Sequence, residues 1–133
     1  MEKFYKDILL HKHIKGGEIM GNCIFCKIIN GEIPSQKVYE DDVVFAFKDI
    51  SPEAPFHILI VPKCHIRNIN EINNDNSHII AHIFEVINKI TVEQGIDKDG
   101  YRVVSNCGEH GGQTVDHLHF HLLGGRNLAW PPG

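Results

Sequence analysis

Five short stretches rich in β-branched, aromatic and other apolar residues, bounded by turn residues, predict five β-strands, and the last of them alternates strictly. We expect these strands at residues 38–39, 43–47, 57–61, 101–106 and 116–123. A charged turn at 40–42 follows the first stretch, and a turn rich in proline at 51–55 precedes the third. Short turns between strands favour antiparallel pairing, so an antiparallel sheet is the expected scaffold.

A first helix is predicted at residues 24–30. Apolar Ile24, Phe25 and Ile28 recur there at helical spacing, and Gly31 and Pro34 end the pattern. This helix is short, because the pattern covers fewer than two full turns.

A second, long helix is predicted to begin at a cap formed by Asn74 or Asp75 and to end at Gly95. Its apolar stripe consists of Ile79, Ile80, Ile83, Phe84, Ile87 and Ile90. One long and one short helix packed on a five-stranded antiparallel sheet give the fold class α+β.

The composition limits the possible partners. The chain has 133 residues, 42% of them hydrophobic, which suffices for one domain with its own core. A formal net charge of -4 provides no broad basic surface, so we expect neither nucleic acid nor a membrane as partner. Four cysteines without a secretory signal predict reduced thiols or metal ligands in a cytoplasmic protein.

Residues 1–19 differ in composition from the rest of the chain. We expect them to be an N-terminal extension, either a translated leader or an added segment, ahead of one domain at residues 20–133. The residues KGGE at 15–18 could be encoded by a purine-rich ribosome-binding site, which makes Met20 the expected biological start.

The stretch DHLHFHLL at 116–123 carries three histidines, His117, His119 and His121, at every second position. On an extended chain the three imidazoles share one face, and the residues between them share the other. The outer two would lie roughly 13 Å apart, too far for one zinc ion to bind all three. We therefore expect divided roles, with a surface-facing His119 carrying the chemistry. Alternation alone does not decide between catalysis and metal binding, and a His-rich strand without function is the third alternative.

Residues 106–114 join the last two predicted strands and contain three glycines. They lack the spacing of glycine and lysine in a P-loop. Glycines let backbone amides approach an anion closely, and Gln113 and Thr114 add side-chain donors. Taken alone, the segment would be an ordinary hairpin loop. Because it leads into the histidine row, we expect it to hold an anion for attack on phosphorus.

The sequence HLHFHLL resembles the His-x-His-x-His-x-x signature of the histidine triad (HIT) family of nucleotide hydrolases and transferases. The similarity extends from about residue 22 to 133, through DISP at 49–52, VPK at 61–63, GGQ at 111–113 and GGR at 124–126. The closing WPPG is similar to the Hint branch, the purine nucleoside phosphoramidases. The resemblance implies a HIT-like fold whose sheet extends across a homodimer, with the long helix and a central strand at the interface.

The resemblance also implies roles for individual residues. His119 would be the nucleophile that takes the nucleoside monophosphate as a covalent phosphoramidate. His121 would contact the phosphate and help the leaving group depart, with His117 and His57 as the other catalytic histidines. Asp49 matches the carboxylate that accepts the ribose hydroxyls. The remaining nucleotide-binding positions are the base walls Phe25, Ile28, Phe47 and Ile50, the phosphate loop Asn106, Gly112, Gln113, Thr114 and Val115, and Trp130 of a partner chain. The apolar base-wall positions fit a plain core equally well.

Cys23 and Cys26 form a Cys-x-x-Cys motif, which alone is moderate evidence for a metal site. Some histidine triad proteins combine this motif with the histidine of PKxH, here His65, and the first histidine of the triad, here His117. The resemblance therefore implies a structural zinc ion with four protein ligands, and no organic cofactor. The alternative is a site without metal, in which His117 is only hydrogen-bonded.

We expect a hydrolase that cleaves P–N bonds of purine nucleoside phosphoramidates, with aminoacyl adenylates among its substrates, through a nucleotidyl-histidine intermediate. Hydrolysis of dinucleoside polyphosphates is the alternative within the enzyme class, and the C-terminal segment argues against it. A noncatalytic nucleotide-binding or interaction module is the alternative from a different class. Such a module would not need His119.

Overall fold

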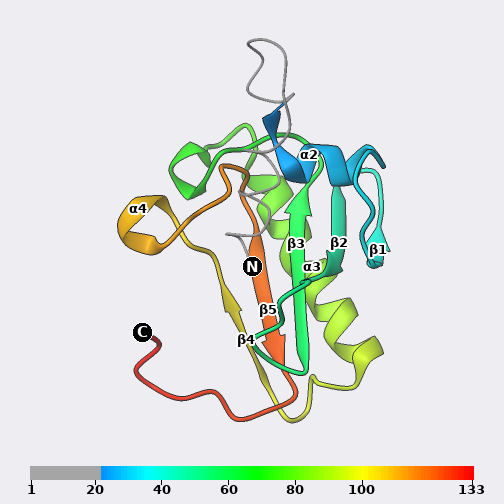
Figure 1. Cartoon of the computed structure of the whole chain (residues 1–133), viewed down its shortest axis with the longest axis vertical. Coiled ribbons are helices and arrows are strands. Elements are labelled where there is room, and N and C mark those ends of the chain that lie inside the picture. The colour runs from blue at the N-terminus through cyan, green and yellow to red at the C-terminus, as the bar shows by residue number, and fades with distance from the viewer. Residues whose placement is uncertain (1–21) are drawn as a thin grey trace.

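The computed structural model describes residues 22–133, and the expected extension at 1–19 lies outside the described residues. The described chain is α+β, with one five-stranded antiparallel sheet in the order β1-β2-β3-β5-β4 (Figure 1). The strands are β1 Lys37–Glu40, β2 Val44–Lys48, β3 Phe56–Pro62, β4 Tyr101–Val104 and β5 Phe120–Gly124. The predicted fold class and the predicted five strands are confirmed.

Each face of the sheet packs against its own helix. The long helix α3, Ser77–Gln94, runs behind the sheet in Figure 1, and the short helix α2, Ile24–Ile29, lies across its upper end. Side chains alternate between the two faces, so β3 buries Ile58 and Ile60 on the α3 side and Leu59 and Val61 on the α2 side. Burying each of these aliphatic side chains contributes about 1.5–3 kcal/mol.

The ends of α3 differ in part from the prediction. Gly95 does end the helix, in a left-handed conformation with φ of 72°. The predicted cap at Asn74 or Asp75 is wrong, because the helix begins after Asn76, whose side-chain oxygen accepts from the backbone of Asn73 instead. Phe84 is 48% exposed although we predicted it in the apolar stripe. The sheet covers one side of the helix, and Phe84 lies at the margin, where its ring meets Phe120 edge-on.

The segment between β4 and β5 also differs from the prediction. It contains a helical turn, α4 Gly108–Gly111, where we expected an open loop. The sequence GEHG has no apolar periodicity to reveal such a turn. The fifth strand begins at Phe120 rather than 116, because pairing with β3 starts at the Ile60–Phe120 pair. A 3-10 turn, η2 Ile69–Glu71, was likewise not predicted.

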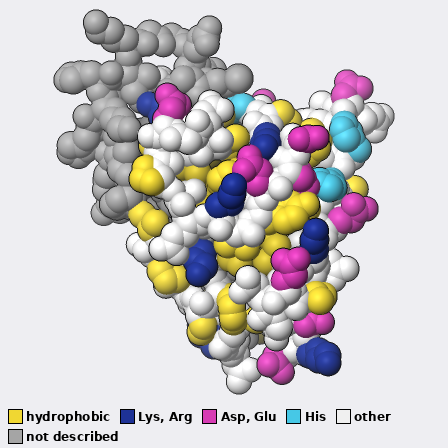
Figure 2. All heavy atoms as spheres, turned by 90° about the vertical axis from the view of Figure 1, so that its right-hand side faces the viewer, with side chains coloured by type: hydrophobic (Ala, Val, Ile, Leu, Met, Phe, Trp, Pro, Cys, Tyr) yellow, Lys and Arg dark blue, Asp and Glu magenta, His cyan; other side chains and the backbone are white. Residues whose placement is uncertain are grey.

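Figure 2 shows the side of the molecule that carries β1 and α3, turned from the view of Figure 1. Hydrophobic side chains remain visible over the middle of this side, and charged side chains and histidines border them. Among residues 22–133 no helix combines the length and the apolar character needed to cross a membrane.

Candidate active site and metal centre

The three histidines of the triad are buried on one side of the chain. His117, His119 and His121 have exposed fractions of 0%, 1% and 8%, while Leu118 and Phe120 pack in the core on the α3 side. The predicted alternation is confirmed. The predicted surface position of His119 is wrong for this chain, because α2 covers it: the Phe25 ring meets the His119 ring edge-on, with 5.1 Å between centroids.

A backbone hydrogen bond fixes the tautomer of His119. Its Nδ1 lies 2.7 Å from the carbonyl oxygen of His117, and a carbonyl only accepts, so Nδ1 carries the proton. The lone pair of neutral His119 is therefore on Nε2. The Ser105 hydroxyl donates to the carbonyl of His119 at 2.9 Å and holds this part of the backbone in place. Sequence reasoning did not identify Ser105, since a serine at the end of a strand gives no distinctive signal.

A second set of contacts fixes the protons of His57 and His121. The Glu53 backbone N–H donates to Nδ1 of His57 at 3.0 Å, so neutral His57 carries its proton on Nε2. That nitrogen lies 2.9 Å from Nδ1 of His121 and 3.2 Å from Oδ2 of Asp49. The His57 proton is thus shared between a ring nitrogen and a carboxylate. His121 accepts on Nδ1 and therefore carries its own proton on Nε2.

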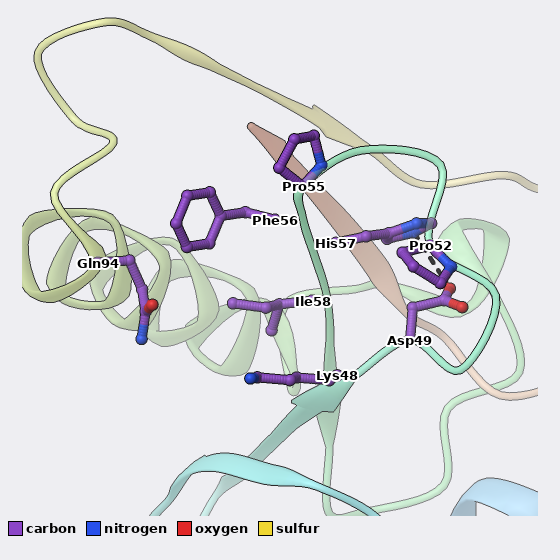
Figure 3. Close-up of a pocket in the computed structure, with 8 residues that line it drawn as sticks. All are labelled: Lys48, Asp49, Pro52, Pro55, Phe56, His57, Ile58 and Gln94. Atoms are coloured by element: carbon purple, nitrogen blue, oxygen red, sulfur yellow. Dashed lines mark ion pairs between the residues drawn. The ribbon is translucent and has the colours of Figure 1, made fainter. Parts of the chain in front are cut away.

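Asp49 is buried at the end of β2, with an exposed fraction of 5%. Its Oδ1 accepts from the Ser51 backbone N–H at 2.8 Å, and its Oδ2 faces His57. A charge in this position is stabilised only by such donors. Figure 3 shows Asp49 and His57 directed toward each other from the ends of two neighbouring strands, with the ion pair drawn between them.

A cavity of about 140 Å³ lies beside this pair, between residues 48–58 and the end of α3. In Figure 3 the side chains of Lys48 and Ile58 are directed toward Gln94, away from Asp49 and His57. Residues on one strand that point oppositely lie on opposite faces of the sheet. The cavity therefore extends toward the α3 side, whereas His119 belongs to the α2 side.

The glycine-rich segment is held in shape by Gln113. Its side-chain Nε2 donates to the carbonyls of Arg67 and Val115, and its Oε1 accepts from the Gly108 backbone. Gly112 adopts a left-handed conformation with φ of 81°, which glycine adopts without a steric penalty. Gln113 thus orders the loop, within which the backbone amides of Gly108, Gly112 and Gln113 already donate to loop acceptors.

The predicted base-wall residues lie near the nucleophile but are largely covered. Phe25, Ile28 and Phe47 are 0–2% exposed and belong to the apolar cluster beneath α2, as does Val115. Of the remaining predicted contacts, Ile50 is 50% exposed and Trp130 80% exposed, whereas Asn106 and Thr114 are half-buried.

Cys23, Cys26, His65 and His117 converge on one point. The Cys23 sulfur lies 3.2 Å from Nδ1 of His117, and the Cys26 sulfur lies 3.4 Å from Nδ1 of His65 and 3.5 Å from Nδ1 of His117. Ligands arranged tetrahedrally around zinc at 2.0–2.3 Å are separated by roughly 3.5–3.8 Å. The four donor atoms all lie within 4.8 Å of one another, so the cluster fits a metal ion of zinc size.

The donor groups are also in suitable protonation states. Nε2 of His117 lies 2.8 Å from the Pro62 carbonyl, so the ring carries its proton there and presents a lone pair on Nδ1 toward the sulfurs. The mutual hydrogen bond of the two thiols lowers the pKa of Cys23 and raises that of Cys26. Metal ligation requires both sulfurs as thiolates, so it would release any proton that they retain.

Comparison with known proteins gives consistent matches. Residues 22–128 match the family model described as scavenger mRNA decapping enzyme C-terminal binding. The chain is 50% identical to the purine nucleoside phosphoramidase of Escherichia coli K12 over 106 residues, 80% of this chain and 89% of the relative. It is 51% identical to a HIT-like protein of Synechococcus elongatus over 110 residues, 83% of this chain and 96% of the relative.

Solved structures agree with this. A HIT family hydrolase from Legionella pneumophila superposes with a TM-score of 0.82 at 50% identity, covering 84% of this chain and 99% of the other. A histidine triad protein from Clostridium difficile superposes with a TM-score of 0.80 at 54% identity, covering 86% and 97%.

Proposed function

The chain belongs to the histidine triad family, and from this premise we propose that it is a nucleotidyl hydrolase that cleaves P–N bonds of purine nucleoside phosphoramidates. Its 50% identity to a purine nucleoside phosphoramidase supports this substrate class. The domain responsible comprises residues 20–133.

The observation that carries the proposal is the hydrogen bond from Nδ1 of His119 to the His117 carbonyl. It leaves the lone pair on Nε2 without any need for a base to remove a proton. An imidazole held in this form is a competent nucleophile toward phosphorus. The shared proton of Asp49, His57 and His121 lies next to it, with 5.1 Å between the ring centroids of His119 and His121.

The reaction proceeds in two displacements. The lone pair on Nε2 of His119 forms a bond to phosphorus, while the P–N bond breaks and its electron pair leaves with the amine nitrogen. That nitrogen takes up a proton passed from solvent through His121. Water then attacks phosphorus and gives up a proton to solvent through His121, the bond to His119 breaks, and the nucleoside monophosphate leaves as the ring regains its lone pair.

We assign nucleotide binding to groups around this centre. Asp49 accepts hydrogen bonds from the ribose hydroxyls, a role that suits an ionised carboxylate. Backbone amides of residues 106–115 other than those of Gly108, Gly112 and Gln113 bind the nonbridging phosphate oxygens, which become more charged in the transition state. The base is bound against the apolar edge formed by Phe25, Ile28, Phe47 and Ile50, with Trp130 supplied by a partner chain.

The Cys23, Cys26, His65 and His117 cluster is proposed to hold one zinc ion per chain. When bound, the ion neutralises the thiolates and cross-links α2 to the start of the histidine row. We also propose a homodimer formed through α3 and β4. Support comes from β4 as one of the two edge strands of the sheet and from the exposed Phe84 and Tyr101.

Steady-state turnover of two substrates on one preparation tests the function. We expect an adenosine or guanosine phosphoramidate to be hydrolysed with a kcat/KM at least 100-fold above that of a dinucleoside polyphosphate, as a roughly 3 kcal/mol preference requires. The reverse order would assign the chain to the polyphosphate hydrolases. Nucleotide binding without turnover of either substrate would indicate a noncatalytic module.

A further inference from the structure

His117 takes part in both the metal cluster and the nucleophile site. Its ring is held at both nitrogens, by the Pro62 carbonyl at Nε2 and by the two cysteine sulfurs at Nδ1. Its backbone carbonyl accepts the proton of His119 Nδ1 at 2.7 Å. The same peptide group donates through the Leu118 N–H to the carbonyl of Ile66, the residue after His65. The orientation of the His117 carbonyl therefore depends on the segments that carry His117 and His65.

A second connection runs through α2. Phe25 lies between Cys23 and Cys26 in the sequence, so the ligation of these cysteines also sets the position of Phe25. Its ring makes edge-to-face contacts with His119 at 5.1 Å and with His117 at 6.0 Å between centroids. The metal cluster is thus connected to the nucleophile by a hydrogen bond on one side and by an aromatic contact on the other.

The fourth ligand reaches the cluster from a separate segment. His65 follows β3, and its ring meets that of His117 edge-on at 4.8 Å between centroids. The Leu118 backbone N–H donates to the Ile66 carbonyl at 2.6 Å, which holds this segment against the histidine row. The ligands of the metal cluster therefore reach His117 from two separate segments, α2 with its cysteines and the segment after β3 with His65.

We propose that the Cys23, Cys26, His65 and His117 cluster, when it holds zinc, positions the nucleophilic His119 for attack, in addition to stabilising the fold. Cys23, Cys26 and His65 are then positioning residues that act through His117 and Phe25. The inference rests on the proposed function for its kinetic consequence. Its structural consequence, the fixed ring of His119, is independent of which substrate is cleaved.

Positioning affects turnover more than affinity. In the proposed site a nucleotide is bound by several groups, and one of them, Asp49, belongs to a cluster separate from the four metal ligands. Attack requires the Nε2 lone pair to align with phosphorus, and a displacement of about 1 Å can cost a factor of about 100 in rate. Loss of zinc should therefore lower kcat by roughly 10- to 100-fold while the dissociation constant of a nucleoside monophosphate changes less than about threefold.

The test compares the full chain with zinc and after chelation, below the melting temperature of both forms. Zinc stoichiometry is measured by elemental analysis, and ¹⁵N-detected NMR of the imidazole rings reports the tautomer and the N–H of His119. We expect one zinc per chain, a single fixed Nδ1–H tautomer with zinc, and averaging between tautomers without it. Kinetics with a purine phosphoramidate and binding of AMP complete the comparison.

Ile87→Ala is the matched control. Ile87 lies in the core cluster on the α3 side, which contains none of the four metal ligands and none of the triad histidines, and its truncation should destabilise the fold. It should lower the melting temperature while leaving kcat, zinc content and the His119 ring signals unchanged. If chelation and Ile87→Ala have the same effects at equal loss of stability, the cluster is merely structural and the inference is overturned.

A second variant keeps the test decisive if the zinc-free chain unfolds. His65→Ala retains three ligands, so its occupancy can be set by added zinc. We expect kcat and the His119 signals to rise together with occupancy. Suppose that the folded variant without zinc has a kcat within twofold of that of the zinc-loaded protein and the same His119 signals. This result would overturn the inference. If the loaded protein has no phosphoramidase activity, the proposed function fails, and the His119 signals alone then decide whether the cluster positions the ring.

Discussion

The protonation pattern of four residues underlies the proposed chemistry. Backbone groups determine it: the His117 carbonyl for His119 and the Glu53 N–H for His57. Because these groups cannot change their donor or acceptor character, the tautomers are fixed before substrate arrives. Such preorganisation lowers the reorganisation needed in the transition state.

Asp49→Asn separates the two roles assigned to this carboxylate. The amide retains one oxygen for the Ser51 N–H, but its NH₂ group cannot accept from the ribose or from His57. We expect the affinity for AMP to fall by about 1–3 kcal/mol, or roughly 5- to 150-fold, as measured by calorimetry. Asp42→Asn, at an exposed turn position, should bind AMP normally. Equal affinity of the two variants would remove Asp49 from the ribose site.

At the level of single residues, the alternation of His117, His119 and His121 could be predicted from the sequence because side chains of an extended chain alternate. The tautomers of His117 and His57 could not, since they depend on Pro62 and Glu53, which reach the site only after folding. The burial of His119 was also missed, because nothing in the sequence shows that α2 covers this face.

At the level of elements, the loop at residues 49–55 is the part that positions His57. Arg126, just after β5, donates through Nε and Nη2 to the Glu53 carbonyl at 3.1 and 2.8 Å, and the Glu53 N–H donates to His57. A hydrogen bond of this kind contributes about 0.5–1.5 kcal/mol, more when one group is charged.

Arg126→Ala should therefore loosen this loop and lower kcat by about 3- to 10-fold, with a smaller loss in Arg126→Lys. Arg102→Ala is the matched control, because Arg102 donates to the Ala129 carbonyl in the C-terminal tail and not to the 49–55 loop. Stopped-flow or steady-state kinetics of these variants measure the change in kcat. If Arg102→Ala slows turnover as much as Arg126→Ala, the arginine contributes general stability and does not position His57.

The turn between β1 and β2 is joined to α3 by a charged network on the side seen in Figure 2. Oδ2 of Asp41 lies 2.6 Å from Nε2 of His82 and accepts from the Tyr39 hydroxyl, while Oδ1 accepts from the Val43 and Val44 backbone. The hydrogen bond to Asp41 raises the pKa of His82 above 6.5. Burial raises the pKa of Asp41, but hydrogen bonds led by that from His82 lower it below 3.8 overall.

This network predicts a pH dependence of stability. The contribution of His82 is complete below its unfolded pKa of about 6.5 and is lost as the pH rises through its raised folded value. The contribution of Asp41 is present above 3.8 and is lost as the pH falls through its lowered value. Denaturant unfolding should thus show a loss of about 0.2–1 kcal/mol above pH 6.5, as is typical of partly exposed pairs. His82→Ala should abolish this slope, and His78→Ala, exposed on the same helix, should keep it. A slope that persists in His82→Ala would contradict the assignment.

The elements themselves were predicted well where a periodic pattern was long, as in α3. They were predicted less well where strand pairing or helix capping determines the first residue of an element. The start of β5 at Phe120 depends on the register with β3, and the cap of α3 at Asn76 depends on the turn at 73–76. The turn α4 has no periodic pattern at all. These features depend on contacts between segments, which a single sequence does not record.

At the level of the whole molecule, β4 leaves one edge of the sheet available for pairing, and Phe84 on α3 is 48% exposed. We expect a homodimer by light scattering, since an exposed edge and an apolar helix face favour association. Phe84→Glu should shift it to monomer, whereas Ile69→Glu, at an exposed position on η2, should not. A wild-type chain that is monomeric at micromolar concentration would refute the assembly.

The covalent intermediate on His119 is the central claim, and locating it is the most direct test. His121→Ala should slow its breakdown, so that the variant can be mixed with a purine phosphoramidate, digested at neutral pH and analysed by mass spectrometry. We expect an acid-labile nucleotidyl group on His119 alone, and none in the double variant that also carries His119→Ala. A nucleotidyl group on His57, His117 or another residue, or sustained turnover by His119→Ala, would contradict it.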